Sequence, residues 1–234
     1  MLAAIHQPNF LPRLKVLQKI ASADIWVVLD DVQYVQREWQ NRARLRHFRK
    51  LDEEYWLTVP VHRPRGRRSV ISEIAMCDPE NTKSKISRAL NVSYGRSPHW
   101  ARVAGILDHL TNFPGPSLSD FNTLTAELLV SALGLQCPPM VRSSTFRIAD
   151  QGSQRLAEIC SRVNATSYLS GSGGRNYLDL LPFREKGIEV KWQLWPDPHP
   201  SNNKIRSRNL SAIDSLARGG YVSPVDPGSG SGLS

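Results

Sequence analysis

Short apolar runs alternate with helical patterns at both ends of the chain. Near the N-terminus, two apolar runs, residues 2–5 and 25–29, enclose a segment over 12–21 with helical spacing. A strand, a helix and a second strand within some 30 residues form a βαβ unit, and its right-handed crossover makes the two strands parallel. The pattern therefore predicts that the chain opens with a parallel pair of strands.

The middle of the chain is helical, because its apolar residues recur at spacings of three and four. We expect helices over residues 82–92, 100–111 and 118–133. Two further strands precede them, over 56–61 and 70–76. After them we expect strands over 140–144, 167–169 and 188–194, and helices over 153–163, 176–181 and 211–217.

This order predicts an α/β fold with a mostly parallel, Rossmann-like sheet flanked by helices, and with a helical middle segment at about 81–135. We expect a single domain over residues 1–222 and a flexible C-terminal tail over 223–234. Ligands of such sheets bind at the carboxyl edge of the strands, so the loops after the strands are the candidate sites.

Composition narrows the class of protein. The chain has 234 residues, of which 40% are hydrophobic and 22% charged, as in an ordinary globular domain. No apolar run approaches the roughly 18 to 20 residues of a membrane span, and the first residues lack a signal-peptide pattern, so we expect a cytoplasmic protein. Three widely spaced cysteines predict reduced thiols, with neither a disulfide framework nor a zinc site.

An excess of basic residues favours an anionic partner. The chain has 30 basic and 21 acidic residues, a net charge of +9. Ten arginines and lysines lie between residues 37 and 68, among Trp39, Tyr55 and Trp56. Such a mixture suits RNA, including tRNA, but no helix-turn-helix, RNP or KH pattern accompanies it. We therefore favour an anionic small molecule, such as a nucleotide or sugar phosphate, and keep RNA binding as an alternative.

The loop after the first strand carries His6, Gln7 and Asn9, and it leads into a helix. Backbone N–H groups at the start of a helix attract anions, and an imidazole or amide can contact phosphate. The alternative is that the amides only satisfy the turn. We take His6 as a candidate catalytic residue, and Gln7 and Asn9 as candidate binding residues.

The loop after the second strand carries two adjacent carboxylates, Asp30 and Asp31. Alternation along the strand points their side chains to opposite sides, which disfavours a paired acid and base, but one of them can hold a magnesium ion, an amine or a ribose hydroxyl. Capping of the next turn is the alternative. Downstream lie the candidate binding residues Gln33, Gln40, Asn41 and Arg42.

The third candidate loop is glycine-rich and joins a strand to a helix. Glycines let successive backbone N–H groups converge on an oxyanion, although a plain flexible connector is the alternative. The candidate binding residues here are Ser170, Gly171, Gly173, Gly174, Arg175 and Tyr177. His199 lies in a rigid, proline-rich loop and can also reach a cleft.

Taken together, several ordered blocks resemble those of the WbqC-like protein family. The blocks are 5–12, 23–34, 39–42, 57–61, 168–171, 177–178 and 209–214. The sequence differs from the family pattern at Arg13-Leu14-Lys15-Val16, where a Trp-Leu-Gly-Tyr stretch is usual. We therefore expect basic side chains in place of an aromatic wall of the substrate pocket.

The resemblance implies a bacterial transferase or ligase of O-antigen, other polysaccharide or specialised-metabolite biosynthesis, which moves an aminoacyl or acyl group such as glycine. In this hypothesis His6 is a general base or phosphate ligand, and Asp30 or Asp31 holds an amine or metal. The loop 171–175 and Arg42 bind an anionic donor or sugar phosphate. The opening of the chain also resembles that of nucleotidyltransferases and pantothenate-synthetase-like ligases. ATP with magnesium and an aminoacyl-tRNA donor are thus the two cofactor alternatives.

Overall fold

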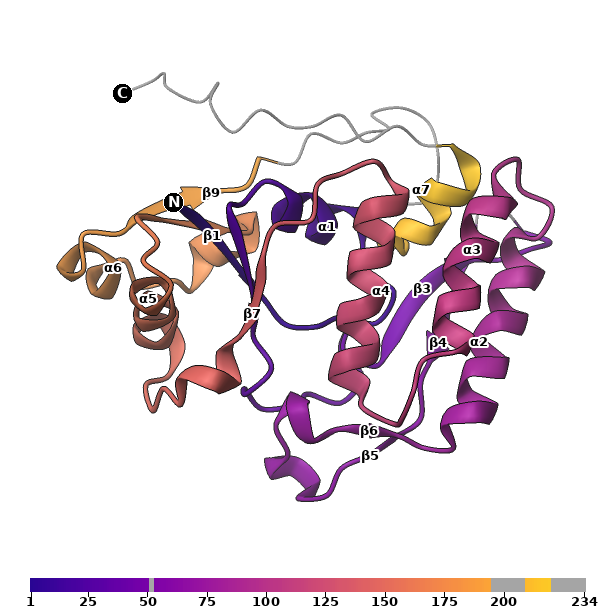
Figure 1. The fold of residues 1–234 in the computed structure, drawn as a ribbon, viewed down its shortest axis with the longest axis horizontal. Coiled ribbons are helices and arrows are strands. Elements are labelled where there is room, and N and C mark those ends of the chain that lie inside the picture. The colour runs from indigo at the N-terminus through magenta and orange to yellow at the C-terminus, as the bar shows by residue number, and fades with distance from the viewer. Residues whose placement is uncertain (51–52, 195–208, 220–234) are drawn as a thin grey trace.

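The computed structural model describes residues 1–50, 53–194 and 209–219, which form an α/β fold (Figure 1). Its centre is a five-stranded sheet in the order β7-β2-β1-β8-β9, and every pair of neighbours is parallel. The strands are β1 (Leu2–His6), β2 (Ile25–Val28), β7 (Met140–Arg142), β8 (Ser167–Ser170) and β9 (Glu189–Trp192). The α/β fold predicted from the sequence is confirmed.

The strand order places a topological switch point beside β1. From β1 the chain proceeds to β2 and then β7 on one side, whereas β8 and β9 lie on the other side. Connections to the two sides leave the sheet in opposite directions, which opens a crevice at the carboxyl ends of the two strands where they diverge. In this molecule that crevice lies at the ends of β1 and β8.

Helices cover both faces of the sheet. Side chains alternate along β2, so that Trp26 and Val28 face one hydrophobic cluster while Val27 faces another. The first cluster is built with α1 (Leu14–Ala21) and the helical middle, and the second with α5 (Gly152–Arg162) and α6 (Leu181–Glu185). Figure 1 shows α5 and α6 on the opposite side of the sheet from α1 and α4.

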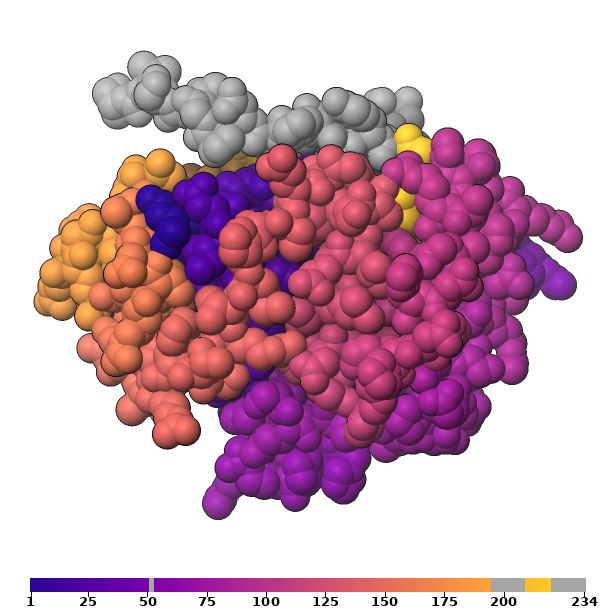
Figure 2. Space-filling model, in the orientation of Figure 1, coloured from indigo at the N-terminus to yellow at the C-terminus, as the bar shows by residue number. Residues whose placement is uncertain are grey.

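The helical middle segment is confirmed. It consists of α2 (Pro79–Tyr94), α3 (Trp100–Thr111) and α4 (Leu118–Ala132). Asp78 and Ser117 cap α2 and α4 by accepting hydrogen bonds from backbone N–H groups in the first turn. The last helix of the described residues, α7 (Ala212–Arg218), packs against α3, α1 and α4. On the face in Figure 2, the N-terminal segment lies between this helical body and the segment that carries α5.

Two small antiparallel pairs differ from the strands expected between residues 56 and 76. One pair joins β3 (Arg42–Arg46) to β4 (Glu54–Thr58), and the other joins β5 (Val61–His62) to β6 (Ala75–Met76). Strand β3 alternates arginines with the buried residues Ala43 and Leu45. In the sequence, this segment looks like part of a charged surface stretch, so no strand was predicted there. The prediction of one continuous strand over 56–61 and another over 70–76 was therefore wrong. The first range is divided between β4 and β5, and the second contains a 3-10 helix at Ile71–Glu73 before β6.

The helix expected over residues 176–181 lies further along the chain. A short 3-10 helix, η4 (Ser172–Asn176), follows β8, and α6 begins at Leu181 with Pro182 in its first turn. The expected tail over 223–234 lies outside the described residues. Among the residues described, no helix is both long and apolar enough to cross a membrane.

Candidate functional site

A pocket of about 750 Å³ lies at the carboxyl ends of β1 and β8. Its polar wall comes from the loop after β1, α1 with the residue before it, the loop that precedes β3, the loop after β8 and the residue after β9. The pocket is large enough for a nucleotide or a sugar derivative. The polar and charged side chains that line it are His6, Gln7, Asn9, Arg13, Lys15, Lys19, Glu38, Gln40, Ser170, Ser172, Arg175 and Gln193.

Strand β1 delivers His6 into the pocket. His6 is the last residue of the strand, and its ring lies beside the side chain of Asn9, with 3.1 Å between Nε2 and the amide nitrogen. When the amide donates this hydrogen bond, the neutral imidazole carries its proton on Nδ1. The loop thus fixes both the orientation and the tautomer of the ring.

The surroundings of His6 hold it in the neutral form. Burial lowers the pKa of His6 well below its usual value, and the positive charges of Lys19, Arg13 and Lys15 lower the pKa further. Nearly all of the imidazole is therefore uncharged at neutral pH. A neutral imidazole has one basic nitrogen, here Nε2, which can act as a general base once its hydrogen bond from Asn9 is exchanged for one from the substrate.

Amide side chains tie the loop after β1 to the loop that precedes β3. Gln40 donates from Nε2 to Oε1 of Gln7 at 2.8 Å, and its own Oε1 accepts from the backbone N–H of Val35. Behind them, Asn122 of α4 donates to the carbonyls of both Pro8 and Gln40. These bonds hold Gln7 and Gln40 as a rigid part of the pocket wall.

The loop after β8 forms the opposite wall. Its residues Gly171, Gly173, Gly174 and Arg175 line the pocket, and the glycines adopt the turn η4. Gly174 is packed so closely that a Cβ atom there would lie 2.3 Å from Oγ of Ser170. The guanidinium of Arg175 lies 5.3 Å from the ring centre of Trp192, so the aromatic face supports it.

Tyr177 lies at the mouth of the pocket. It is 77% exposed although it is an aromatic residue, and it lines the pocket beside two other exposed apolar side chains, Val35 and Leu194. An aromatic ring in this position offers a flat surface to a sugar or a base.

Among the described residues, four cations and a single carboxylate line the pocket. Arg13, Lys15, Lys19 and Arg175 line the pocket, and Glu38 is the carboxylate. Arg13 and Lys15 are the basic side chains that the departure from the family pattern led us to expect in the pocket wall, whereas Lys19 was missed from the sequence. Lys15 and Lys19 are four residues apart on an amphipathic helix, which places them on one face, and this spacing was the available signal.

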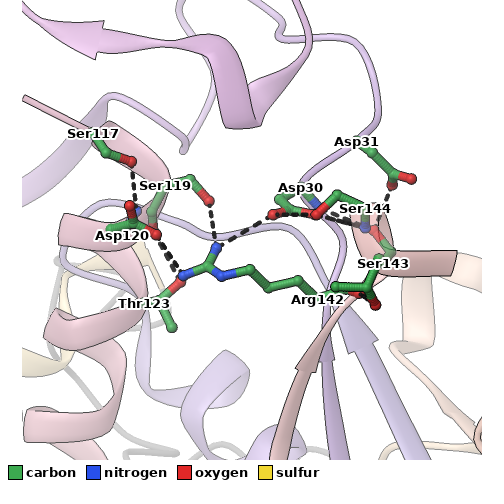
Figure 3. Close-up of polar contacts among 10 residues, drawn as sticks. Asp30, Asp31, Ser117, Ser119, Asp120, Thr123, Arg142, Ser143 and Ser144 are labelled. Atoms are coloured by element: carbon green, nitrogen blue, oxygen red, sulfur yellow. Dashed lines mark hydrogen bonds and ion pairs between the residues drawn. The ribbon is translucent and has the colours of Figure 1, made fainter. Parts of the chain in front are cut away.

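Asp30 lies beside the pocket, within a separate ion cluster (Figure 3). It is 1% exposed, and its carboxylate accepts hydrogen bonds from the backbone N–H and hydroxyl of Ser144 and from Arg142. Arg142 also pairs with Asp120 at 2.6 Å. The pocket lining includes Leu29 but not Asp30. In this arrangement Asp30 fastens the end of β2 to the end of β7.

Asp31 belongs to the same cluster. It accepts a hydrogen bond from Ser143 and forms an ion pair with Arg155 of α5. Neither carboxylate therefore lines the pocket with His6, although the sequence predicts that one of the two shares a cleft with it. The physical reason is that β2 ends at Val28, so strand alternation no longer holds at residues 30 and 31. Ser143 contacts both carboxylates, and Arg142 and Arg155 pair with them, so both side chains turn toward β7 and α5.

Three other candidate residues also lie outside this pocket. Gln33 donates to the carbonyl of Arg67 at 2.8 Å, and the buried Asn41 donates to the carbonyl of Val59 at 2.9 Å. The guanidinium of Arg42 stacks on Trp56 at 3.9 Å from the ring centre. His199, also a candidate, lies outside the described residues.

The arrangement suits an anionic ligand. A phosphate or carboxylate can pair with the cations around the pocket, and His6 stands beside them as a proton acceptor. The residues fit the phosphates of a nucleotide through Lys15 and Arg175, and Glu38 is the lining side chain able to contact a magnesium ion. The described part of the chain has no cluster of three or more histidines, cysteines or carboxylates that could bind a metal on its own.

Comparison with known proteins places the chain in a family. Residues 7–223 match the WbqC-like protein family. The chain is also 32% identical over 232 residues to the uncharacterized protein Rv1507c of Mycobacterium tuberculosis, an alignment that covers 94% of this chain and 95% of that protein. No solved structure matches it significantly. With most of its length matched, this chain belongs to the WbqC-like protein family.

Proposed function

We propose that this protein is an enzyme that transfers an acyl or aminoacyl group to an amine of a small anionic acceptor, with His6 as the general base. One observation carries the proposal: an imidazole held neutral in a cation-lined pocket at the switch point of a parallel sheet. The resemblance to WbqC-like proteins suggested the same class of reaction, and an amino sugar is the acceptor that fits it.

The charge of the pocket favours this chemistry in two ways. The cations attract an anionic acceptor, such as a nucleotide sugar. They also disfavour an ammonium group, so the acceptor amine is bound more readily in its neutral, nucleophilic form. As the amine nitrogen attacks the acyl carbon, Nε2 of His6 releases its hydrogen bond from Asn9 and accepts the proton that the nitrogen loses, and the leaving group departs with its electron pair.

An ATP-using ligase is the second candidate. Its support is the position of the pocket, because parallel α/β sheets bind nucleotides at the switch point. In that case Lys15 and Arg175 hold phosphates, and ATP activates the carboxylate that is then transferred. The two candidates differ in whether ATP is consumed or whether a preformed donor, such as an aminoacyl-tRNA, is sufficient.

The first experiment is a donor and acceptor screen with the purified protein. Amino acids with ATP, and separately aminoacyl-tRNA, are combined with amine-bearing nucleotide sugars, and mass spectrometry detects an acceptor that gains an acyl group. For the reaction found, we expect His6→Ala to lower kcat/KM roughly 100- to 10,000-fold, the usual range for loss of a general base.

The pH profile and a matched variant make the test specific. Because the pKa of His6 lies below its usual value near 6.5, we expect the acidic limb of kcat/KM below pH 6.5. His62 is an exposed histidine on β5, and His62→Ala should leave activity unchanged. Full activity in His6→Ala would remove the assigned role.

A further inference from the structure

Lys19 is a buried cation without an anionic partner among the described residues. It is 5% exposed and lines the pocket. Its Nζ donates to the carbonyl of Ile5 at 2.7 Å and lies 5.7 Å from the ring centre of Tyr168. None of the ion pairs formed within residues 1–50, 53–194 and 209–219 includes Lys19.

This arrangement is energetically unfavourable for the empty protein. An ammonium group has three N–H donors, and the carbonyl of Ile5 is the one acceptor that the described residues provide. A buried charge is costly unless it is paired and hydrogen-bonded. Burial accordingly lowers the pKa of Lys19 to about 8, yet the side chain is still mostly charged at pH 7.

The rest of the pocket does not supply the missing negative charge. Glu38 interacts with Arg13, whose pKa it raises, and it is not among the groups that act on Lys19. The titratable groups around Lys19 are Cys160 of α5, Tyr168 of β8 and His6 on β1, whose pKa Lys19 lowers. Arg13 and Lys15 line the same pocket and add further positive charge.

We propose that Lys19 binds an anionic group of the substrate, a phosphate or a carboxylate, and holds it beside His6. The ligand then supplies the counter-ion and the hydrogen-bond acceptors that the fold does not provide. This role of Lys19 rests on the proposed function, in which the neighbouring His6 is the general base. Lys19 is then the side chain that recognises the charged group of the substrate.

Proton uptake on binding provides a direct measurement. An anion stabilises the charged form of Lys19, so binding near pH 8.5 must draw a proton onto the amine. Cys160 and Tyr168 do not interfere, because burial raises the pKa of the thiol to about 12 and raises the pKa of the phenol also. We expect an uptake of about 0.7 proton for each anion bound at pH 8.5.

The measurement is isothermal titration calorimetry at pH 8.5 in two buffers with different ionisation enthalpies. Sulfate represents a phosphoryl group and acetate a carboxylate, and neither of them titrates near this pH. Binding of sulfate alone identifies a phosphoryl site, and binding of acetate alone identifies a carboxylate site. Failure of both to bind, or binding without proton uptake, overturns the proposal.

Variants locate the effect. Lys19→Met should lower the affinity by about tenfold or more and abolish the proton uptake, whereas Lys85→Met, which removes an exposed lysine of α2, should change neither. Unchanged affinity in Lys19→Met would contradict the proposal. If that variant does not fold, the proton uptake of the wild type still decides. The experiment measures binding without turnover, so its outcome is independent of whether His6 acts as a base.

Discussion

At the scale of single residues, the pocket depends on atoms packed at close range. Gly174 is the clearest case, because a Cβ atom there would lie 2.3 Å from Oγ of Ser170 and 3.1 Å from the ring of Trp192. The hydroxyl can rotate, but the indole ring must move with its strand. Glycine at this position therefore lets the loop after β8 lie against the end of its own strand.

Gly174→Ala should consequently destabilise the protein. Overpacking of a buried site costs about 1–3 kcal/mol, and displacement of Ser170 and Trp192 should also weaken the binding of pocket ligands. Urea unfolding followed by tryptophan fluorescence measures the first effect. Gly173→Ala serves as the control, since a Cβ atom at Gly173 meets no atom within 4 Å; equal losses in the two variants would disprove the packing argument.

Residue types predicted this site only in part. His6 and the glycine loop could be predicted, because each directly follows an apolar strand and strand ends share an edge. Asp30 follows its strand in the same way, but whether it reaches the pocket depends on Ser144 and Arg142, more than 100 residues away. The spacing of Lys19 from Lys15 places both on one helix face, but the burial of Lys19 beside Tyr168 is a property of the packed structure that the sequence does not show.

At the scale of elements, an ion pair fastens the β3–β4 hairpin to α7. Arg46 of β3 donates from Nε and Nη2 to the two carboxylate oxygens of Asp214 at 2.8 and 2.9 Å. The two side chains are 11% and 9% exposed. The hydrogen bonds raise the pKa of Arg46, and the backbone N–H of Arg46 also donates to the phenol of Tyr94. A hairpin from early in the chain is thereby tied to its last described helix.

Removal of one partner should leave a buried charge. We expect Asp214→Asn to lower the free energy of unfolding by about 3 kcal/mol, because breaking a buried pair costs more than the pair contributes. The midpoint of urea denaturation is the readout. Asp108→Asn, which neutralises an exposed carboxylate of α3, should change stability by less than about 0.5 kcal/mol. A loss of that small size in Asp214→Asn would show that the pair is dispensable.

The elements of the central sheet could be predicted because both faces of a parallel sheet are buried. Such strands are short apolar runs, and those at 2–5 and 25–29 end within one residue of β1 and β2. Strand β3 escaped prediction because its outer face consists of arginines that pair with distant groups, such as Asp214. Local sequence carries no information about those partners.

At the scale of the whole molecule, several arginines of the basic segment 37–68 have partners within the fold. In the basic segment, Arg44 pairs with Glu54, Arg65 with Glu73, and Arg42 stacks on Trp56. The interleaving of arginine and tryptophan thus has an explanation within the fold. RNA binding stays a prediction from the sequence. The cations that line a defined ligand site are those of the pocket.

The free energy of unfolding should depend on pH because the charge of Lys19 is buried in the pocket. The pKa of Lys19 is about 8 in the folded protein and near 10.4 in an unfolded chain. Between these values the unfolded chain binds more protons, so Lys19 makes stability rise with pH in this range. Below pH 8 both states are protonated, and the folded protein bears the full penalty of about 3 kcal/mol.

The difference in stability between the wild type and Lys19→Met isolates this contribution, because other titrating groups cancel in it. In a buffer free of binding anions, we expect the wild type to gain roughly 2 kcal/mol relative to the variant between pH 7 and 9.5. Urea unfolding at several pH values measures the gain. A difference that does not vary with pH would mean that Lys19 has an ordinary pKa and a satisfied charge. A rising difference, reduced at pH 7 when sulfate is added, would show that the penalty is relieved by a ligand.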